Sequence, residues 1–347
     1  MDTDRRKRPA KAPVPHGQQC LFCRVDNTSE TAATIVSIEF GRIEVNQHPL
    51  VSIVTPSYNM AQYLEEAIQS VLTQDYPHIE YIVMDGGSTD GSLEILRKYE
   101  GRLRYVSETD HGQTDAINKG FMQSHGQIFA FLCADDTYLP GAVSTAVRHM
   151  LESRGHAGIY GEGYLTDEAG VTLCRYPTKE FDPELLKTEC FICQPASFLW
   201  REAYADAGML NPEIHYGLDY DLWIRIAKKY SLRRVNEYLA TSRMHRGSKT
   251  LRERTLTFKG NVEITKAHYG YVPYTHIYGY CASRLDKRDG FFEPIPSSLT
   301  KYAFSLVYGS LQNRRHRWRY WREWFERGSP RLSARLLGRS ATRSGHS

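Results

Sequence analysis

Two adjacent carboxylates, Asp135 and Asp136, follow an apolar run of the chain that ends at Cys133. Neighbouring carboxylates repel each other unless a cation or hydroxyl donors lie between them. Mg²⁺ and Mn²⁺ prefer carboxylate and phosphate oxygens, so the pair predicts a site for a divalent ion and a phosphorylated compound. The alternative is a solvated helix N-terminus, since Thr137 and Pro140 follow, but this accounts for only one of the two acids.

Polar side chains also follow three earlier apolar runs. Tyr58 and Asn59 come after the first run, Asp85 after the second and Asp110 after the third. The carboxyl ends of parallel strands meet at one edge of a sheet, and ligands bind at that edge. We therefore expect these side chains and the carboxylate pair to surround a single site.

The elements that would position these residues alternate between strand and helix patterns from residue 50 onward. This alternation is typical of βαβ units and predicts an α/β fold, with a Rossmann-like, mainly parallel sheet flanked by helices. The expected strands are 50–55, 79–84, 103–106 and 128–133, and the expected helices are 60–72, 93–99 and 114–124. In the second half we expect a hairpin of 159–165 and 171–175, strands at 193–200 and 232–239, and a helix at 219–229.

Five segments that carry these polar residues occur in order, each at an expected strand end or helix start. They are Thr55-Pro56-Ser57-Tyr58-Asn59, Asp85 to Gly91, Asp110 to Gly120, Ala134-Asp135-Asp136 and Tyr216 to Trp223. Together they resemble the family 2 inverting glycosyltransferases of the bacterial polysaccharide type, which have the GT-A fold, over residues 49–245. The resemblance implies transfer of a sugar from a nucleotide-sugar donor, with UDP- or dTDP-linked donors favoured, to a glycan or lipid-linked acceptor. It also implies Mg²⁺ or Mn²⁺ as cofactor.

The resemblance assigns roles to several of these residues. Asp136 would ligate the metal that bridges the diphosphate, and Asp135 would approach the ribose. Asp85 would accept a hydrogen bond from the ring N–H of uracil or thymine. The base would be flanked by Pro56, Tyr58 and Asn59.

The segment from Asp110 to Gly120 opens a helix, and its N-terminal amides could bind an anion. We predict that Asp110, Asp115 and Lys119 bind the donor at its diphosphate or ribose. A capped helix with a surface lysine remains an equally open alternative for Lys119.

An inverting transfer needs one carboxylate to deprotonate the acceptor hydroxyl. Asp219 matches the position of the family's base, although Leu218 stands where an acid often precedes it. We expect Asp221 to be a first-turn acid near the positive end of the helix dipole. His245 follows the last strand, where related enzymes carry a loop that closes over the diphosphate or metal. We predict it as a metal ligand, with an ordinary surface or core histidine as the alternative.

The chain divides into an N-terminal extension at 1–48, partly disordered, a GT-A domain at 49–250 and a helical, basic and aromatic C-terminal extension at 251–347. The formal charge is +4. Ten arginines between residues 314 and 343 face two glutamates there, an excess of eight, so the rest of the chain carries −4. Tryptophans at helical spacing among these arginines predict a helix that lies on an anionic membrane. A packed helix or a disordered end is the alternative, and no motif indicates nucleic-acid binding.

Seven cysteines and the absence of an apolar run behind the charged N-terminus indicate a reducing compartment. We expect a cytoplasmic protein, with peripheral attachment to the inner face of the membrane, and no membrane-spanning segment. Cys20 and Cys23, with Cys190 and Cys193, could instead form a four-thiolate zinc site.

There are three alternative functions. A nucleotidyltransferase would show a Gly-rich basic loop after the first strand, and a Rossmann oxidoreductase would show G-x-G-x-x-G there. Neither motif follows residue 55. The remaining alternative is a catalytically degenerate protein that binds a nucleotide-sugar or glycan, against which the intact acids argue.

Overall fold

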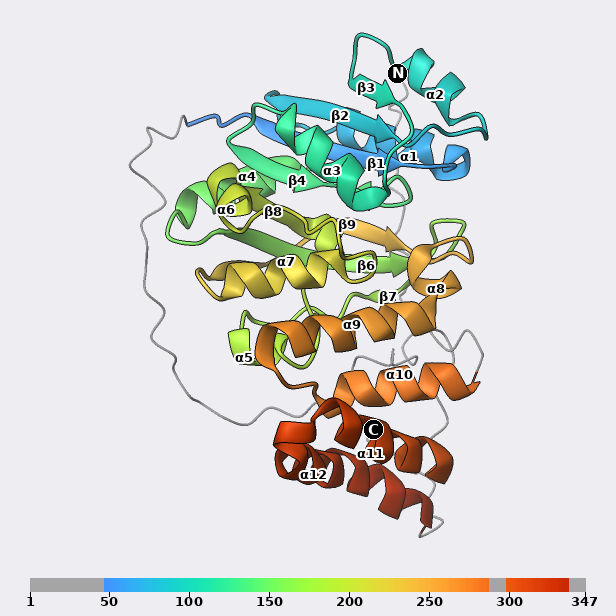
Figure 1. Cartoon of the computed structure of the whole chain (residues 1–347). Coiled ribbons are helices and arrows are strands. Elements are labelled where there is room, and N and C mark those ends of the chain that lie inside the picture. The colour runs from blue at the N-terminus through green and yellow to red at the C-terminus, as the bar shows by residue number, and fades with distance from the viewer. Residues whose placement is uncertain (1–46, 287–297, 337–347) are drawn as a thin grey trace, which may run out of the picture.

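The computed structural model describes residues 47–286 and 298–336, with side chains to residue 328 (Figure 1). The predicted extension at 1–48 therefore lies almost entirely outside the described residues, as do Cys20 and Cys23. None of the described helices combines the length and the apolar character that a membrane span requires.

A nine-stranded sheet forms the centre of the described part of the chain. Its first half is parallel: β1 (Val51–Ser57) pairs with β2 (Ile79–Asp85) and β4 (Ile128–Phe131), and β2 pairs with β3 (Arg104–Ser107). β1 and β4 are buried along their whole length, as expected for parallel strands with helices on both faces.

The second half of the sheet is joined by antiparallel pairs. β8 (Ser197–Trp200) pairs with β4 and with β6 (Gly158–Thr166), which also forms the predicted hairpin with β7 (Thr172–Arg175). β9 (Leu232–Arg243) runs parallel to β6 and pairs with the short β5 (Thr137–Tyr138). The expected α/β class is confirmed, but the parallel pairing is confined to β1–β4 and to β6 with β9.

Helices flank this sheet, and those at residues 61–72, 92–98, 113–122 and 218–227 agree with the helices expected from the sequence. They are α1 (Ala61–Leu72), α2 (Ser92–Lys98), α3 (Gln113–Met122), α4 (Ala142–Glu152), α5 (Pro183–Leu186), α6 (Arg201–Asp206) and α7 (Leu218–Ala227). α3 lies close to β1 because Gly120 has no side chain: a Cβ there would lie 2.5 Å from Cγ1 of Val54. The expected strand at 193–200 begins instead with the 3-10 turn η1 (Gln194–Ala196), since Pro195 has no backbone N–H to donate.

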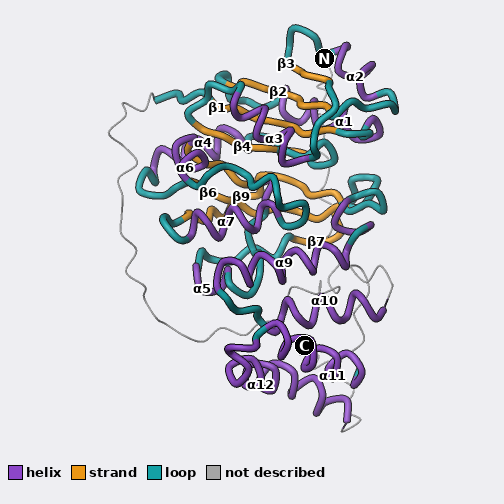
Figure 2. The backbone as a smooth tube through the Cα atoms, in the orientation of Figure 1, coloured by secondary structure: helices purple, strands orange, loops and turns teal. Residues whose placement is uncertain are grey.

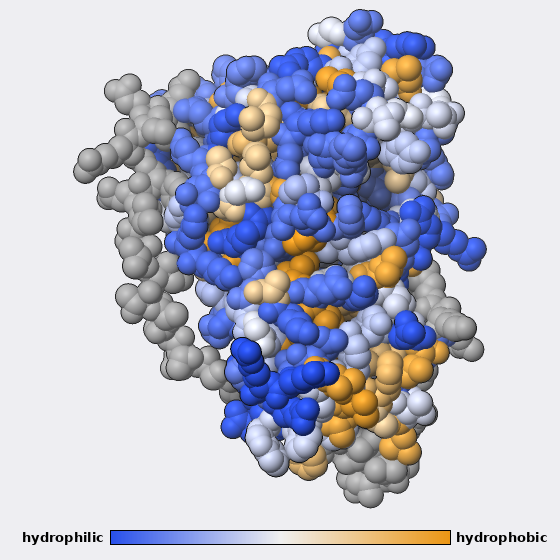
Figure 3. Space-filling model, viewed as in Figure 1, coloured by the Kyte–Doolittle hydropathy of each residue, from blue (hydrophilic) through white to orange (hydrophobic). Residues whose placement is uncertain are grey.

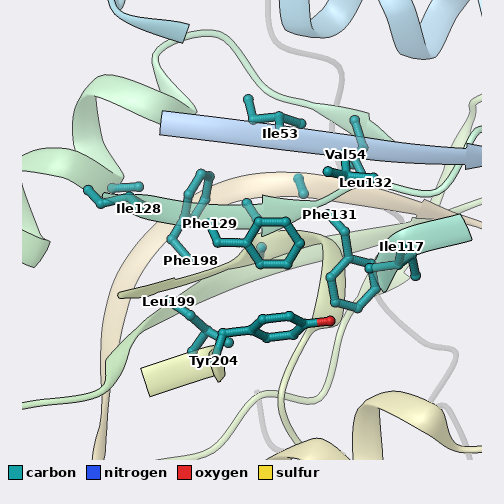
Figure 4. Packing of buried hydrophobic residues seen from close by; sticks show 14 of the residues in the cluster. Ile53, Val54, Ile117, Ile128, Phe129, Phe131, Leu132, Phe198, Leu199 and Tyr204 are labelled. Carbon is teal, nitrogen blue, oxygen red and sulfur yellow. The ribbon is translucent and has the colours of Figure 1, made fainter. Parts of the chain in front are cut away.

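Aromatic side chains pack beneath β4, the strand that leads to the carboxylate pair (Figure 4). The rings of Phe129 and Tyr204 lie 4.6 Å apart, and Phe121 packs against both. Phe198 of β8 belongs to the same buried cluster, so β4 packs against side chains from α3, α6 and β8.

The C-terminal helices are α8 (Lys249–Arg252), α9 (Arg254–Tyr269), α10 (Tyr274–Asp286), α11 (Leu299–Gln312) and α12 (Arg317–Leu336), with the 3-10 turn η2 (Arg314–His316) before α12. α10–α12 form an all-helical end of the molecule, away from the strands (Figure 2). α9 joins the two parts, because its Ile264 belongs to the main core and its Val262 to a second core with Tyr302 and Tyr320.

Candidate active site

A cleft of about 770 Å³ opens at the carboxyl ends of β1, β2 and β4. Residues that follow these strands line part of it. The rest of the lining includes residues 215–219 at the start of α7 and residues between 242 and 252 at the end of β9 and in the loop after it. Of the predicted site residues, the cleft is lined by Pro56, Tyr58, Asp110, Asp135, Asp136 and Asp219.

The carboxylate pair lies in the cleft together with Cys133. Donor atoms of Cys133, Asp135 and Asp136 all lie within 4.8 Å of one another. Asp136 is buried, and its Oδ1 accepts a hydrogen bond from the backbone N–H of Arg243 at 2.9 Å. Burial, and then the negative charge of Asp135, raise the pKa of Asp136 well above its ordinary value.

These three residues fit a divalent cation. The positive charge of a bound cation would offset both causes of the raised pKa of Asp136, namely burial and the neighbouring carboxylate. The guanidinium of Arg243 is engaged elsewhere, by Glu66 at 2.6 Å and by the backbone oxygen of Asp135 at 3.0 Å. Oxygen ligands are what Mg²⁺ and Mn²⁺ prefer, and a thiol adds a softer donor.

His245, which follows β9, contacts the carboxylate pair. Its Nε2 lies 3.0 Å from Oδ2 of Asp135, and its ring packs on Tyr63 with centroids 4.7 Å apart. His245 is not one of the three converging residues, so its role as a metal ligand stays a prediction.

Asp85 is buried next to the cleft at the end of β2. Its carboxylate accepts hydrogen bonds from the hydroxyl of Ser88 at 2.5 Å, the backbone N–H of Ser88 at 3.0 Å and the hydroxyl of Ser107 at 2.7 Å. Asn59 joins the same loop, because its Oδ1 accepts from the backbone N–H of Thr89 at 2.8 Å. Asn59 therefore braces the two strand ends, whereas the Tyr58 side chain is 61% exposed at the cleft.

The start of α3 contributes Asp110, whose Oδ1 accepts from the backbone N–H of Gly112 at 2.7 Å. Asp115 caps the same turn through the N–H of His111 and forms an ion pair with Lys119 at 3.1 Å. Neither Asp115 nor Lys119 lines the cleft. Their contacts favour the alternative of a capped helix with a surface lysine, and their donor-binding role stays a prediction.

Asp219 lies in the first turn of α7. It lines the cleft, and no hydrogen bond from another side chain to its carboxylate is found in the part of the chain that the structure describes. Burial raises the pKa of Asp219 above its ordinary value. A carboxylate with a raised pKa is a better proton acceptor near neutral pH, as a general base requires.

The C-terminal helices brace the segment that carries Asp219. Asp221 is buried and accepts from Nε2 of His268 on α9 at 2.7 Å and from Nε of Arg225 at 2.8 Å. Tyr220 donates to the backbone oxygen of Leu186 and contacts His276 on α10. α9 also approaches the loop before α7 closely, because a Cβ on Gly260 would lie 2.7 Å from the backbone oxygen of Tyr216.

Two further side chains of the cleft were not predicted from the sequence. Cys133 ends the apolar run before the carboxylate pair, where its position marks it only as part of a buried strand. Lys249 lies in the same loop as His245; its Nζ is 5.0 Å from the ring centroid of Tyr216, and burial lowers its pKa. Cys190 also lines the cleft, but the converging ligands found among the described residues include neither it nor Cys193, so nothing supports the zinc alternative.

Comparison with known proteins identifies the family. The sequence model of glycosyl transferase family 2 matches residues 52–208. The "Uncharacterized glycosyltransferase RC0461" of Rickettsia conorii is 33% identical over 223 residues, which cover 59% of this chain and 36% of that protein. The "Putative teichuronic acid biosynthesis glycosyltransferase TuaG" of Bacillus subtilis is 31% identical over 207 residues, or 57% of this chain and 81% of that protein. The chain belongs to glycosyl transferase family 2.

The relatives differ in length from this chain, which spans little more than a third of the Rickettsia conorii protein. Among solved structures, S. aureus TarS 1-349 in complex with UDP-GlcNAc aligns with a TM-score of 0.49 and 13% identity, over 77% of this chain and 89% of that chain.

The buried ion pair of Asp221 yields a test by pH. Although burial alone would raise it, the hydrogen bond from His268 and the charge of Arg225 hold the pKa of Asp221 below its ordinary value. The pair therefore stabilises the fold at neutral pH, and this contribution is lost as pH falls below about 4. Asp221→Asn should lower the free energy of unfolding by about 2 kcal/mol at pH 7, with the difference from wild type shrinking at pH 3.5.

Urea unfolding at the two pH values measures this difference. Asp206→Asn is the control, because Asp206 pairs with Lys229 on the exposed surface and should change stability by less than about 1 kcal/mol. Equal stabilities of Asp221→Asn and wild type at pH 7 would contradict the bracing of α7.

Proposed function

We propose that the protein transfers a sugar, with inversion, from a nucleoside-diphosphate sugar to a glycan or lipid-linked acceptor. The observation that carries the proposal is the shared cleft: Asp135, Asp136 and Asp219 all line it. A single displacement needs the leaving diphosphate and the acceptor's base on opposite sides of the sugar. UDP- and dTDP-linked donors are favoured through the family resemblance.

The donor's diphosphate would lie at the carboxylate pair. Asp136 and Asp135, with Cys133 beside them, would hold Mg²⁺ or Mn²⁺, which would supply positive charge to the leaving diphosphate. Lys249 and Arg252, which follow β9, also line the cleft and would add positive charge from the protein.

The base of the nucleotide would lie beside Pro56 and Tyr58. The exposed ring of Tyr58 offers a flat surface for stacking. Asp85 accepts three hydrogen bonds from the protein, and a carboxylate has about four acceptor positions. One position remains for the ring N–H of uracil or thymine.

Asp219 would take the proton of the acceptor hydroxyl. As the acceptor oxygen bonds to the anomeric carbon, the bond from that carbon to the diphosphate oxygen breaks with its electron pair. The raised pKa of Asp219 supports this role, because the carboxylate must accept a proton that the hydroxyl holds tightly.

The surface of α11 and α12 supports attachment to an anionic membrane, where lipid-linked acceptors reside. Trp324 does not belong to this surface, because its ring packs on Tyr302 and its Nε1 donates to Ser305. The exposed apolar residues are Leu299, Val307, Leu311, Trp318, Trp321 and Phe325. Apolar residues gather beside strongly hydrophilic ones over these helices (Figure 3), and the exposed arginines include Arg314, Arg315, Arg317, Arg319 and Arg322.

A membrane surface attracts such a combination of arginines and apolar side chains. Of the ten arginines between residues 314 and 343, Arg331 and Arg335 lie on the last turns of α12. Arg339 and Arg343 lie outside the described residues.

A screen of nucleotide-sugars tests the proposed reaction. Released nucleoside diphosphate, measured with an acceptor extract, should appear with a UDP- or dTDP-linked sugar and Mn²⁺, and EDTA should abolish it. Asp136→Ala should lose transfer while its circular dichroism stays that of wild type. Full transfer in EDTA would reject the metal-dependent mechanism, and no release from any donor would reject the proposed function.

The base is tested by two isosteric substitutions in α7. Asp219→Asn removes the proton acceptor and should lower kcat by about 10² to 10⁴, with donor affinity kept. Asp221→Asn should be milder, since its carboxylate pairs with His268 and Arg225. In wild type, kcat should fall as pH drops through the raised pKa of Asp219, at a pH above about 4. A dead Asp221→Asn beside an active Asp219→Asn would mean that the wrong carboxylate has been named.

Membrane attachment is tested by point substitutions on the exposed surface, because deleting α12 would remove Tyr320 from the second core. Trp318→Ala/Phe325→Ala should weaken binding to vesicles that contain phosphatidylserine, and salt should weaken the binding of wild type. Val171→Ala/Leu173→Ala is the matched control, since both residues are exposed and apolar but lie at β7. Vesicle binding that is equal in all three proteins would exclude this surface.

A further inference from the structure

The cleft holds one sulfur atom at its metal-binding carboxylates. Sγ of Cys133 and carboxylate oxygens of Asp135 and Asp136 lie within 4.8 Å of one another. Two ligands at about 2.0 to 2.3 Å from one ion lie no more than about 4.6 Å apart. A small side-chain adjustment would therefore let the sulfur and both carboxylates reach the same ion.

Polar neighbours hold this sulfur at a defined place. Nε2 of Gln113, the first residue of α3, donates to Sγ of Cys133 at 3.1 Å, and the thiol faces Oε1 of Gln194 at 3.9 Å. Gln194 is itself fixed, because its Nε2 donates to the backbone oxygen of Phe131 at 2.7 Å. Cys193 and Cys281, by contrast, are fully buried among apolar side chains.

We propose that Cys133 is a ligand of the metal site and that the site binds thiophilic divalent ions, Zn²⁺ and Cd²⁺, through this sulfur together with carboxylate oxygen. The inference rests on the metal site of the proposed function and concerns its choice of ion. Soft thiolate ligands select ions such as Zn²⁺, whereas Mg²⁺ takes only oxygen. The sulfur thus favours Zn²⁺ and Cd²⁺ over Mg²⁺ at this site.

Titration with Cd²⁺ tests the sulfur directly, because a Cd²⁺–thiolate bond produces an ultraviolet charge-transfer band. Cys20 and Cys23 form a C-x-x-C pair that could bind Cd²⁺ by itself, so the full chain carries Cys20→Ser/Cys23→Ser as background. No donor sugar or acceptor is present, so the result does not depend on whether transfer occurs.

The background protein should show the band, and Cys133→Ser should lose it. Removing even a supporting residue of a metal site commonly costs about 10- to 100-fold in affinity. We therefore expect the Kd for Cd²⁺ to rise at least tenfold in Cys133→Ser, with Mg²⁺ affinity unchanged. Cys190→Ser is the matched control, because its thiol lines the same cleft but is not among the converging ligands, and it should keep the band.

Asp136→Asn tests whether the sulfur and the carboxylate share one ion. It should weaken Cd²⁺ binding while the band remains at saturation. A band that persists in Cys133→Ser, or is absent from the background protein, would overturn the proposal. So would full Cd²⁺ affinity in Asp136→Asn, because the sulfur would then bind the ion alone. A protein that shows the expected bands but transfers no sugar would contradict the proposed function and leave this inference standing.

Discussion

The burial of Asp136 beside the half-buried Asp135, after the end of β4, is the constraint on which the site depends. Asp136 is buried beside Asp135, and both burial and that neighbour disfavour its charged form. Groups from more than a hundred residues later contact the pair: the backbone N–H of Arg243 donates to Asp136, which favours its charged form, and the ring of His245 contacts Asp135. β9 brings them there because it lies between β6 and β5, where Thr137 and Thr241 pair across the two strands. The position of β9 in the sheet therefore places these two groups at the carboxylate pair.

The segment that carries Asp219 depends on helices beyond the sheet. Asp219 lies on α7, and the residues around it are held by α9 and α10 through Asp221, Tyr220 and Tyr216. Because α9 contributes to both hydrophobic cores, the C-terminal helices form a structural unit with the wall of the cleft. The predicted boundary at residue 250 separates two kinds of sequence, but the packing crosses it.

Much of the first half of the site could be predicted because its signals are local. Apolar runs, turn residues and acids at strand ends follow one another along the chain, so the carboxylate pair and Asp110 were found from their positions alone. Asn59, Asp115 and Lys119 could not be assigned from their positions alone. Asn59 accepts a hydrogen bond from Thr89, which lies 30 residues further along the chain, whereas Asp115 and Lys119 pair with each other within one helix; a motif reveals neither contact.

The sequence by itself determined the α/β class, the order of the strand-end acids, and the presence of an acid at the start of α7. These follow from periodicity and turn chemistry, which act over a few residues. Only the tertiary structure decided which side chains share the cleft, because that depends on packing between distant segments. It brought His245 to Asp135, paired Asp221 with His268, and turned Trp324 into the second core while Trp318 stayed exposed. Each of these outcomes depends on a partner more than ten residues away or on the burial of a whole helix face, and neither is encoded in local spacing.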